Sequence, residues 1–337
     1  MTACITSNSL AEKIDSFNGC QVLIIGDVML DHYQYGSVER ISPEAPVPIV
    51  KVEHEEFHLG GAANVAKNIK RLGGTPFLIG LCGQDQRYRQ LQGLLHGEGI
   101  EHEILTSIDW RTTVKTRVVA QGQQVLRVDQ EVSGEKDFEA LDIIPILRNV
   151  LAGYRVVLIS DYGKGMITKV LLDTVHEYKR PGTRVLVDPK TRNFQLYSGA
   201  FLITPNLKEA SEGANLVIKG RDDLLKAGSE ILNQDRCQNL LITLGPDGMV
   251  LFCQDKTVWK IPTMARKVYD VTGAGDTVIA VIGGALSAGL DIVQACVLAN
   301  YAAGIVVGQL GAAAITAEEL KSYVLHQEEP LMIQSWQ

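Results

Sequence analysis

Residues 268–277 combine glycines with an aspartate just before an apolar run. They end in Gly273-Ala274-Gly275-Asp276 and lead into an apolar run of small residues at 278–290. This pattern predicts a glycine-rich turn that opens a helix, where free N–H groups and the helix dipole attract an anion such as phosphate. The Asp276 carboxylate would repel phosphate, so it needs another role. It can take a proton from an attacking hydroxyl or cap the helix, and this segment alone leaves both roles open.

A second glycine-rich segment favours the catalytic role. The run Gly60-Gly61-Ala62-Ala63-Asn64 precedes a helix-like stretch, and further glycines follow at Gly73 and Gly83. In this order, the two segments resemble the two signatures of the PfkB family of sugar kinases, which has the ribokinase-like fold. The resemblance implies transfer of phosphate from ATP to a sugar hydroxyl with Mg²⁺. It also implies that Asp276 is the general base.

Length and composition fit a globular enzyme. The chain of 337 residues is long for one domain but suits a large α/β domain with an appendage, so one domain over 1–337 is expected. Its 46% hydrophobic and 21% charged residues are ordinary for a globular protein. A net charge of −7 argues against a nucleic-acid partner.

The cysteines and the apolar segments indicate a cytoplasmic protein with no membrane partner. The six cysteines form no Cys-x-x-Cys pair, so we expect reduced thiols in a reducing compartment. The N-terminus lacks the pattern of a secretory signal. Asn300, Tyr301 and Gln309 interrupt the apolar residues 297–315, which predicts a buried helix and turn rather than a membrane span.

Short apolar runs alternate with helix-period runs along most of the chain. This alternation predicts a mainly parallel central sheet with helices on both faces. Ligands bind such sheets beyond the carboxyl ends of the strands, which makes Asp27, Asp161, Asp188, Asn206 and Gly245 candidates as a set. The predicted strands are 22–26, 76–81, 156–160, 184–187, 201–203 and 240–243, and the predicted helices are 61–72, 86–97, 138–151, 169–178, 207–213 and 222–233.

Two stretches do not fit the alternation, at 33–58 and 112–129. The first is proline-rich with a β-like part, and the second alternates around Gln121-Gly122, a plausible hairpin turn. Together they predict a small separate β-layer. In the family that the chain resembles, this layer is a lid over the sugar and often the dimer contact. We therefore expect a homodimer through the β-lid.

Four further segments, at 26–31, 40–48, 160–165 and 187–190, narrow the resemblance. They resemble the branch of the family that phosphorylates D-glycero-β-D-manno-heptose 7-phosphate at its anomeric 1-hydroxyl, on the route to ADP-heptose and the lipopolysaccharide core. Thr191 stands where a glycine is expected, which leaves the shape of that loop open. Many members carry a fused adenylyltransferase. No histidine here forms its His-x-Gly-His motif, so we expect a stand-alone kinase.

The resemblance also implies roles for individual residues. The backbone N–H groups of Gly273, Ala274 and Gly275 are expected to face the transferring phosphoryl oxygens. The residues expected to bind the sugar are Asp27, Asp31, Gly60, Gly61 and Asn64. The residues expected to bind ATP are Asn206, Thr243, Gly245, Gly248 and Asn300. Glu209 is expected to act on Mg²⁺ through water.

Several of these residues have plain structural alternatives. An aspartate after a strand, such as Asp27, is often a turn former. Asn206 and Glu209 have the spacing of a helix capping box, a role compatible with the magnesium one. Asn300 could equally be a satisfied buried amide.

Lys164 and Lys190 are the leading candidates to hold a sugar phosphate. Each follows a predicted strand end, so both should face the same crevice. Lys115, Arg117 and Arg127 on the lid are alternatives.

Three other functions remain open from the sequence. One is a PfkB-family kinase of another sugar or a nucleoside, and another is a non-catalytic sugar- or nucleotide-binding regulator. The third, a dinucleotide oxidoreductase, is disfavoured because no Gly-x-Gly-x-x-Gly opens a helix after a strand. No P-loop is present either.

Overall fold

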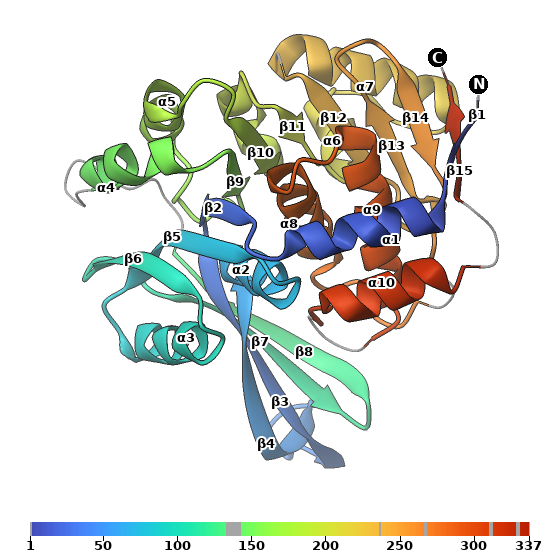
Figure 1. Cartoon of the computed structure of the whole chain (residues 1–337). Helices are drawn as coiled ribbons and strands as arrows, with labels where there is room; N and C mark the ends of the chain where they lie inside the picture. Colours follow the sequence, from blue (N-terminus) through green and yellow to red (C-terminus); the bar gives the residue numbers. More distant parts are fainter. Residues whose placement is uncertain are drawn as a thin grey trace.

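The computed structural model describes residues 2–132, 143–235, 237–265, 268–309, 313–327 and 331–336. Within them, the chain forms an eleven-stranded main sheet and a separate four-stranded sheet (Figure 1). The fold is therefore the predicted α/β arrangement of a central sheet flanked by helices, with a second, small sheet.

Parallel pairing joins the larger part of the main sheet, and all six predicted strands lie in it. The prediction missed the parallel edge strand β6 and the antiparallel strands at the other side. In spatial order the strands are β1 (Thr2–Ile5), β15 (Leu331–Ser335), β14 (Val258–Ile261), β13 (Met249–Phe252), β12 (Asn239–Thr243), β11 (Leu202–Ile203), β10 (Arg184–Asp188), β9 (Val156–Ser160), β2 (Gln21–Gly26), β5 (Thr75–Gly83) and β6 (Glu101–Ser107).

Alternate residues of the parallel strands pack into two separate cores. On β2, Val22 and Ile24 belong to one core and Leu23 and Ile25 to the other, and all four are fully buried. Burial on both faces explains why these strands are continuous apolar runs. The first core includes residues of α1 (Ser7–Ile14), α2 (Ala62–Arg71), α3 (Gln86–Gly97), α8 (Ala274–Ser287), α9 (Ile292–Val306) and α10 (Ala317–Leu325), and the second includes residues of α4 (Ile143–Val150), α5 (Lys169–Tyr178), α6 (Leu207–Gly213) and α7 (Arg221–Asp235).

The four-stranded sheet corresponds to the predicted lid and projects from one side of the main body (Figure 1). Its order is β4 (Pro48–Gly61), β3 (Val28–Ile41), β7 (Thr113–Ala120) and β8 (Gln123–Gln130). The turn between β7 and β8 is at Gln121-Gly122, as predicted. Both turn residues have positive φ, 53° and 77°, as a two-residue hairpin turn requires.

The first lid hairpin is longer than the predicted 33–58. Strand β3 begins two residues after the end of β2, at Val28, and β4 continues to Gly61, the N-cap of α2. Residues 28–33 are all buried, so they lack the alternation that marks an exposed strand. The hairpin therefore carries Asp31, Gly60 and Gly61 directly into the junction between lid and main sheet.

Two other predictions concern segments that lie only partly within the described residues. The helix predicted at 138–151 is observed from Ile143, and residues 138–142 lie outside the described part. The apolar segment from residue 297 continues helix α9 and then a turn, as predicted, up to residue 309. No helix in the described residues is long and apolar enough to cross a membrane.

Candidate active site

Three aspartates meet at the carboxyl ends of β2, β9 and β10. Asp27 and Asp161 directly follow β2 and β9, and Asp188 ends β10. The parallel register brings the strand ends together, because Gly26 pairs with Ser160 and Ser160 pairs with Asp188. The aspartates predicted from strand ends therefore form a real spatial cluster.

Asp276 lies in the first turn of α8 but does not cap that helix. The N-cap is Gly273, with φ of 77° and ψ of 2°, a left-handed conformation that glycine adopts without strain. The Asp276 carboxylate instead accepts hydrogen bonds from Asn64 Nδ2, at 2.7 Å, and from the Tyr162 hydroxyl. Of the two roles that the sequence left open, the structure excludes the capping one.

The surroundings of Asp276 suit a base. The side chain is 5% exposed, and burial raises its pKa to about 6. The hydrogen bonds from Asn64 and Tyr162 oppose this rise in pKa, while the negative charge of Asp31 adds to it and Lys115 reduces it. A carboxyl group with this pKa is mostly ionised at neutral pH and is a better proton acceptor than an exposed aspartate.

The N–H groups at the start of α8 are partly free. The N–H of Ala274 donates to Val271 O at 3.2 Å, within the turn. Among the hydrogen bonds of the described residues, the N–H groups of Gly273 and Gly275 have no acceptor. Two of the three predicted donors are therefore available to an anion.

A buried polar network fixes Asp276 from helix α2. Asn68 Nδ2 donates to the carbonyl oxygen of Asn64 at 2.9 Å, and Thr277 Oγ1 donates to Asn68 Oδ1 at 3.1 Å. All these side chains are buried. The network ties α2 to α8, so the two glycine-rich segments of the sequence form one site.

The lid hairpin contributes Asp31 and the glycine pair. Asp31 is 6% exposed and forms an ion pair with Arg117 of β7. A Cβ atom on Gly60 would lie 2.6 Å from Asp31 Oδ2, and one on Gly61 would lie 2.4 Å from Asp27 O. The two glycines are therefore needed for β4 to approach these aspartates.

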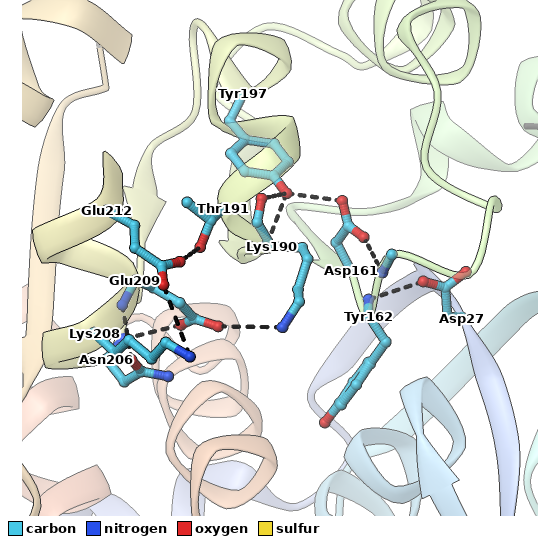
Figure 2. A network of polar contacts seen from close by, with 11 residues as sticks. Asp27, Asp161, Tyr162, Lys190, Thr191, Tyr197, Asn206, Lys208, Glu209 and Glu212 are labelled. Atoms are coloured by element: carbon cyan, nitrogen blue, oxygen red, sulfur yellow. Dashed lines mark hydrogen bonds and ion pairs between the residues drawn. The ribbon is translucent and has the colours of Figure 1, made fainter. Parts of the chain in front are cut away.

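Asp27 is bound by the protein's own backbone. Its Oδ2 accepts N–H bonds from Tyr162, at 2.8 Å, and Lys164, at 2.9 Å, and its Oδ1 accepts one from Met166 at 3.0 Å (Figure 2 shows the bond to Tyr162). Burial raises the pKa of Asp27 to about 6, and the negative charge of Asp161 adds to this. Asp27 thus holds the loop after β9, and its predicted sugar contact stays a prediction.

Both lysines predicted to hold a sugar phosphate have acidic partners. Lys164 forms an ion pair with Glu131, which follows the last lid strand. Lys190 Nζ lies 3.9 Å from Glu209 Oε1 and is half exposed (Figure 2). A sugar phosphate would have to displace these carboxylates from the lysines or share the lysines with them.

Two residues of the site, Tyr162 and Lys115, were not singled out as leading candidates from the sequence. Lys115 Nζ lies 5.0 Å from the centre of the Tyr162 ring, and burial lowers the pKa of Lys115. In the described part of the chain, Lys115 forms no ion pair. Alternation along β7 could have indicated it, because Lys115 and Arg117 share one face, paired with Asp31 and Tyr33.

Asn206 and Glu209 form the predicted capping box at the start of α6. Asn206 Oδ1 accepts the Glu209 N–H at 2.9 Å, and Glu209 Oε2 accepts the Asn206 N–H at 3.1 Å. Burial raises the pKa of Glu209. It also raises the pKa of Asp188 well above its ordinary value, and the nearby charges of Asp276 and Glu209 add to that rise.

This concentration of carboxylates suits a hydrated divalent cation. Mg²⁺ keeps several of its waters and needs few protein oxygens. The described residues hold no cluster of three side chains that could ligate a metal directly. The role of Glu209 on Mg²⁺ through water stays a prediction.

A cavity of about 380 Å³ opens beside the start of α8. Ala274 and Gly275 form part of its wall, so the cavity reaches the turn that carries Asp276. Four of the five predicted nucleotide-side residues line it, and Asn206 is not among its lining residues. The four are Thr243, Gly245, Gly248 and Asn300.

Small and apolar residues also line the cavity. They are Ala303 and Gly304 of α9, Val307 at the C-cap of that helix, and Val278 of α8. Asn300 Nδ2 donates to Pro262 O at 2.7 Å, so this amide also has the structural role that the sequence left open.

Comparisons with known proteins agree with this geometry. The family model described as pfkB family carbohydrate kinase matches residues 21–319. The chain is 42% identical over 306 residues to "Bifunctional protein HldE" of Nitratiruptor sp., covering 90% of this chain and 64% of that protein. It is 44% identical over 319 residues to the protein of the same name from Stutzerimonas stutzeri, covering 93% and 65%. The chain thus spans about two thirds of the length of these curated relatives.

Solved structures share the fold at low sequence identity. Phosphofructokinase-2 from Escherichia coli, in complex with substrates and products, superposes with a TM-score of 0.76 at 20% identity, covering 90% of this chain and 98% of that one. Arabidopsis thaliana ribokinase, complexed with ribose and ATP, gives a TM-score of 0.71 at 18% identity, covering 92% and 100%. The ribokinase-like fold expected from the sequence is confirmed. With the two glycine-rich segments joined at Asp276, the chain belongs to the pfkB family of carbohydrate kinases.

Proposed function

We propose that this protein uses ATP to phosphorylate D-glycero-β-D-manno-heptose 7-phosphate at the anomeric 1-hydroxyl, giving the 1,7-bisphosphate for ADP-heptose and lipopolysaccharide core synthesis. The observation that carries the proposal is the place of Asp276. It is a buried carboxylate with a raised pKa, at a helix N-terminus that also borders a cavity of nucleotide size. Similarity to the HldE proteins and the four segments of the heptose branch support the choice of sugar.

In the proposed reaction, Asp276 takes the proton of the attacking hydroxyl. Asn64 and Tyr162 each donate to one carboxylate oxygen, so the proton goes to a remaining lone pair on one of these oxygens. Each carboxylate oxygen can accept a further hydrogen bond. The N–H groups of Gly273 and Gly275, together with the dipole of α8, stabilise negative charge on the transferring phosphoryl group.

ATP is proposed to occupy the cavity beside α8. Thr243, Gly245 and Gly248, with Asn206 nearby, belong on the nucleotide side, and Asn300 belongs by the adenine or ribose. Glu209 would hold Mg²⁺ through water. Mg²⁺ supplies neutralisation of the phosphate charge during the transfer.

The sugar is proposed to bind between the lid and Asp276, against Asp31, Gly60, Gly61 and Asn64. Asp27 would act on the sugar indirectly, by holding the loop that carries Tyr162 and Lys164. Lys164 and Lys190 are proposed to hold the 7-phosphate. Lys115 is a third candidate, since it lies against Tyr162 and forms no ion pair among the described residues.

We also propose that one domain spans the chain and that the lid forms a homodimer. The outer strand β8 and the residue before β4 expose apolar side chains to water: Val47 is 51% exposed, Leu126 55% and Val128 50%. Both edges of the lid sheet, β4 and β8, offer backbone groups to a partner.

The test is ADP release with a panel of sugars, including heptose 7-phosphate, unphosphorylated heptose, fructose 6-phosphate and ribose. We expect the highest kcat/KM for heptose 7-phosphate, and phosphorus NMR of the product should show a new phosphate at C1. A higher kcat/KM for another sugar would overturn the choice of substrate. Absence of ADP release with every sugar would favour the non-catalytic regulator.

A second test addresses the sugar phosphate. Lys115→Met, Lys164→Met and Lys190→Met are compared on phosphorylated and unphosphorylated heptose, with Lys169→Met as the matched control, because Lys169 is exposed on α5 and pairs only locally with Asp173. A charge-assisted contact contributes about tenfold to over a hundredfold in binding. Loss confined to the phosphorylated sugar identifies the phosphate ligand. Equal loss on both sugars, or a change only in KM for ATP, would contradict that role.

A further inference from the structure

Tyr162 is fixed at both of its ends. Its backbone N–H donates to Asp27 Oδ2 at 2.8 Å, and its hydroxyl donates to Asp276 Oδ1. The ring is half-buried, and Lys115 Nζ lies against one face, 5.0 Å from the ring centre. Figure 2 shows the ring pointing away from Asp161 and Asp27, away from the loop that anchors its backbone.

The loop that carries Tyr162 is held by two buried carboxylates. Asp27 accepts the N–H groups of Tyr162, Lys164 and Met166. Asp161 Oδ1 accepts the N–H of Gly163 at 2.7 Å, and its other oxygen is bound by Tyr197 and Asn193. These bonds fix the loop and so place the Tyr162 hydroxyl on one oxygen of Asp276.

We propose that Tyr162 is a positioning residue for the catalytic base: its hydroxyl holds Oδ1 of Asp276 opposite Asn64, and Asp27 in turn holds Tyr162. This proposal rests on the proposed role of Asp276 as the base. It gives Asp27 a function in the reaction that needs no contact with the sugar.

The hydrogen bond from Tyr162 favours the ionised form of Asp276, because a donor stabilises the charged carboxylate. Other groups also face Asp276. Asn64 on α2 donates to its second oxygen, Asp31 on β3 and Asp188 on β10 add negative charge, and Lys115 on β7 adds positive charge. Removing the hydroxyl of Tyr162 leaves all of these in place.

The test is Tyr162→Phe, which keeps the ring and removes only the hydroxyl. We expect the acid limb of the kcat/KM profile for the sugar to move to higher pH by about one unit, the size that loss of one hydrogen bond to a charged group gives. KM for ATP should stay unchanged. The matched control is Tyr178→Phe, because Tyr178 ends α5 and packs against Arg148, outside the site. Its profile should equal that of the wild type.

A second measurement does not depend on turnover. NMR of isotope-labelled aspartate carboxyl groups follows the titration of Asp276, whose signal is the one missing in Asp276→Asn. The Tyr162→Phe variant should titrate at higher pH than the wild type. If the wild type phosphorylates no sugar, this titration still tests the hydrogen bond, so failure of the proposed function and failure of this inference can be told apart.

A fall in activity of equal size at every pH, with an unmoved acid limb, would overturn the proposal. An unchanged titration of Asp276 in the variant would overturn it as well. Thermal unfolding of both tyrosine variants shows whether any lost activity comes from lost structure.

Discussion

Replacing Asp276 by asparagine is expected to lower the activity of this protein without lowering its stability. The substitution keeps the size of the side chain but removes its charge and its basic oxygen. Loss of a general base lowers kcat by ~10²–10⁴-fold. The affinity for ATP should change little, because the residues that line the cavity beside α8 are untouched.

The same substitution should leave the folded protein as stable as the wild type, or more stable, at neutral pH. Burial raises the pKa of Asp276 from 3.8 to about 6. A difference of about 2 units, at about 1.4 kcal/mol each, makes the buried charge cost about 3 kcal/mol at pH 7. The new amide group would face a donor, Asn64 or Tyr162, and an unsatisfied buried donor costs about 1–3 kcal/mol. The expected net gain is therefore about 0–2 kcal/mol.

The sign of the pH dependence follows from the raised pKa. Below the unfolded-state value of 3.8, Asp276 is protonated in both states and the charge costs nothing. As pH rises toward the folded-state pKa of about 6, the unfolded chain ionises first, so the wild type loses stability relative to the variant. Above that value the difference is constant.

Two measurements check this reasoning. Steady-state kinetics gives kcat and the KM for ATP of the variant and the wild type. Chemical unfolding from about pH 4 to about pH 8 gives their difference in free energy of unfolding, which should grow up to about pH 6 and then level off. A variant that kept more than a tenth of wild-type kcat would contradict the role of Asp276 as base. A stability difference that did not vary with pH would contradict its buried, raised-pKa state.

Three further predictions concern the metal, the turn and the lid. Glu209→Gln should raise the Mg²⁺ concentration needed for half-maximal activity, and EDTA should abolish activity; full activity in EDTA would refute the metal role. Gly275→Ala should fold normally, because its Cβ would meet no atom within 4 Å, but it should lower kcat because the methyl group intrudes on the phosphoryl-binding space. Gly273→Ala should also lower the stability of the protein, by about 1 kcal/mol, because φ of Gly273 is 77°. Unaltered kinetics in Gly275→Ala would contradict this assignment of the turn. Light scattering at micromolar concentration should show a dimer that Leu126→Asp converts to a monomer, and a monomeric wild type would refute the lid interface.

Local sequence patterns determined most of the fold. The six predicted strands are continuous apolar runs because both faces of the main sheet are covered, so they can be recognised from the sequence alone. The hairpin at Gln121-Gly122 and the capping box of Asn206 and Glu209 were also predicted, since turn and cap chemistry acts over a few neighbouring residues.

The prediction was weaker where burial or pairing hides the local pattern. Strand β3 begins at Val28 in a wholly buried stretch, so its change from main sheet to lid leaves no alternation to detect. Strands β13 and β14 span only four residues each. The prediction overlooked the apolar run of β13, and β14 carries a lysine among its two half-buried residues, so its local pattern is weak.

The sequence by itself determined the fold class, the family signatures and the set of polar residues at the strand ends. Only the tertiary structure decided what each of those residues does. It placed Asp276 in the first turn of α8 rather than at its N-cap. It showed that Asp27 accepts a hydrogen bond from the backbone of Tyr162, and that Lys164 and Lys190 form ion pairs with glutamates. The physical reason is that a side chain's role depends on which donors and charges lie within a few ångströms. In this chain, Asn64 and Asp276 meet across 212 positions of sequence.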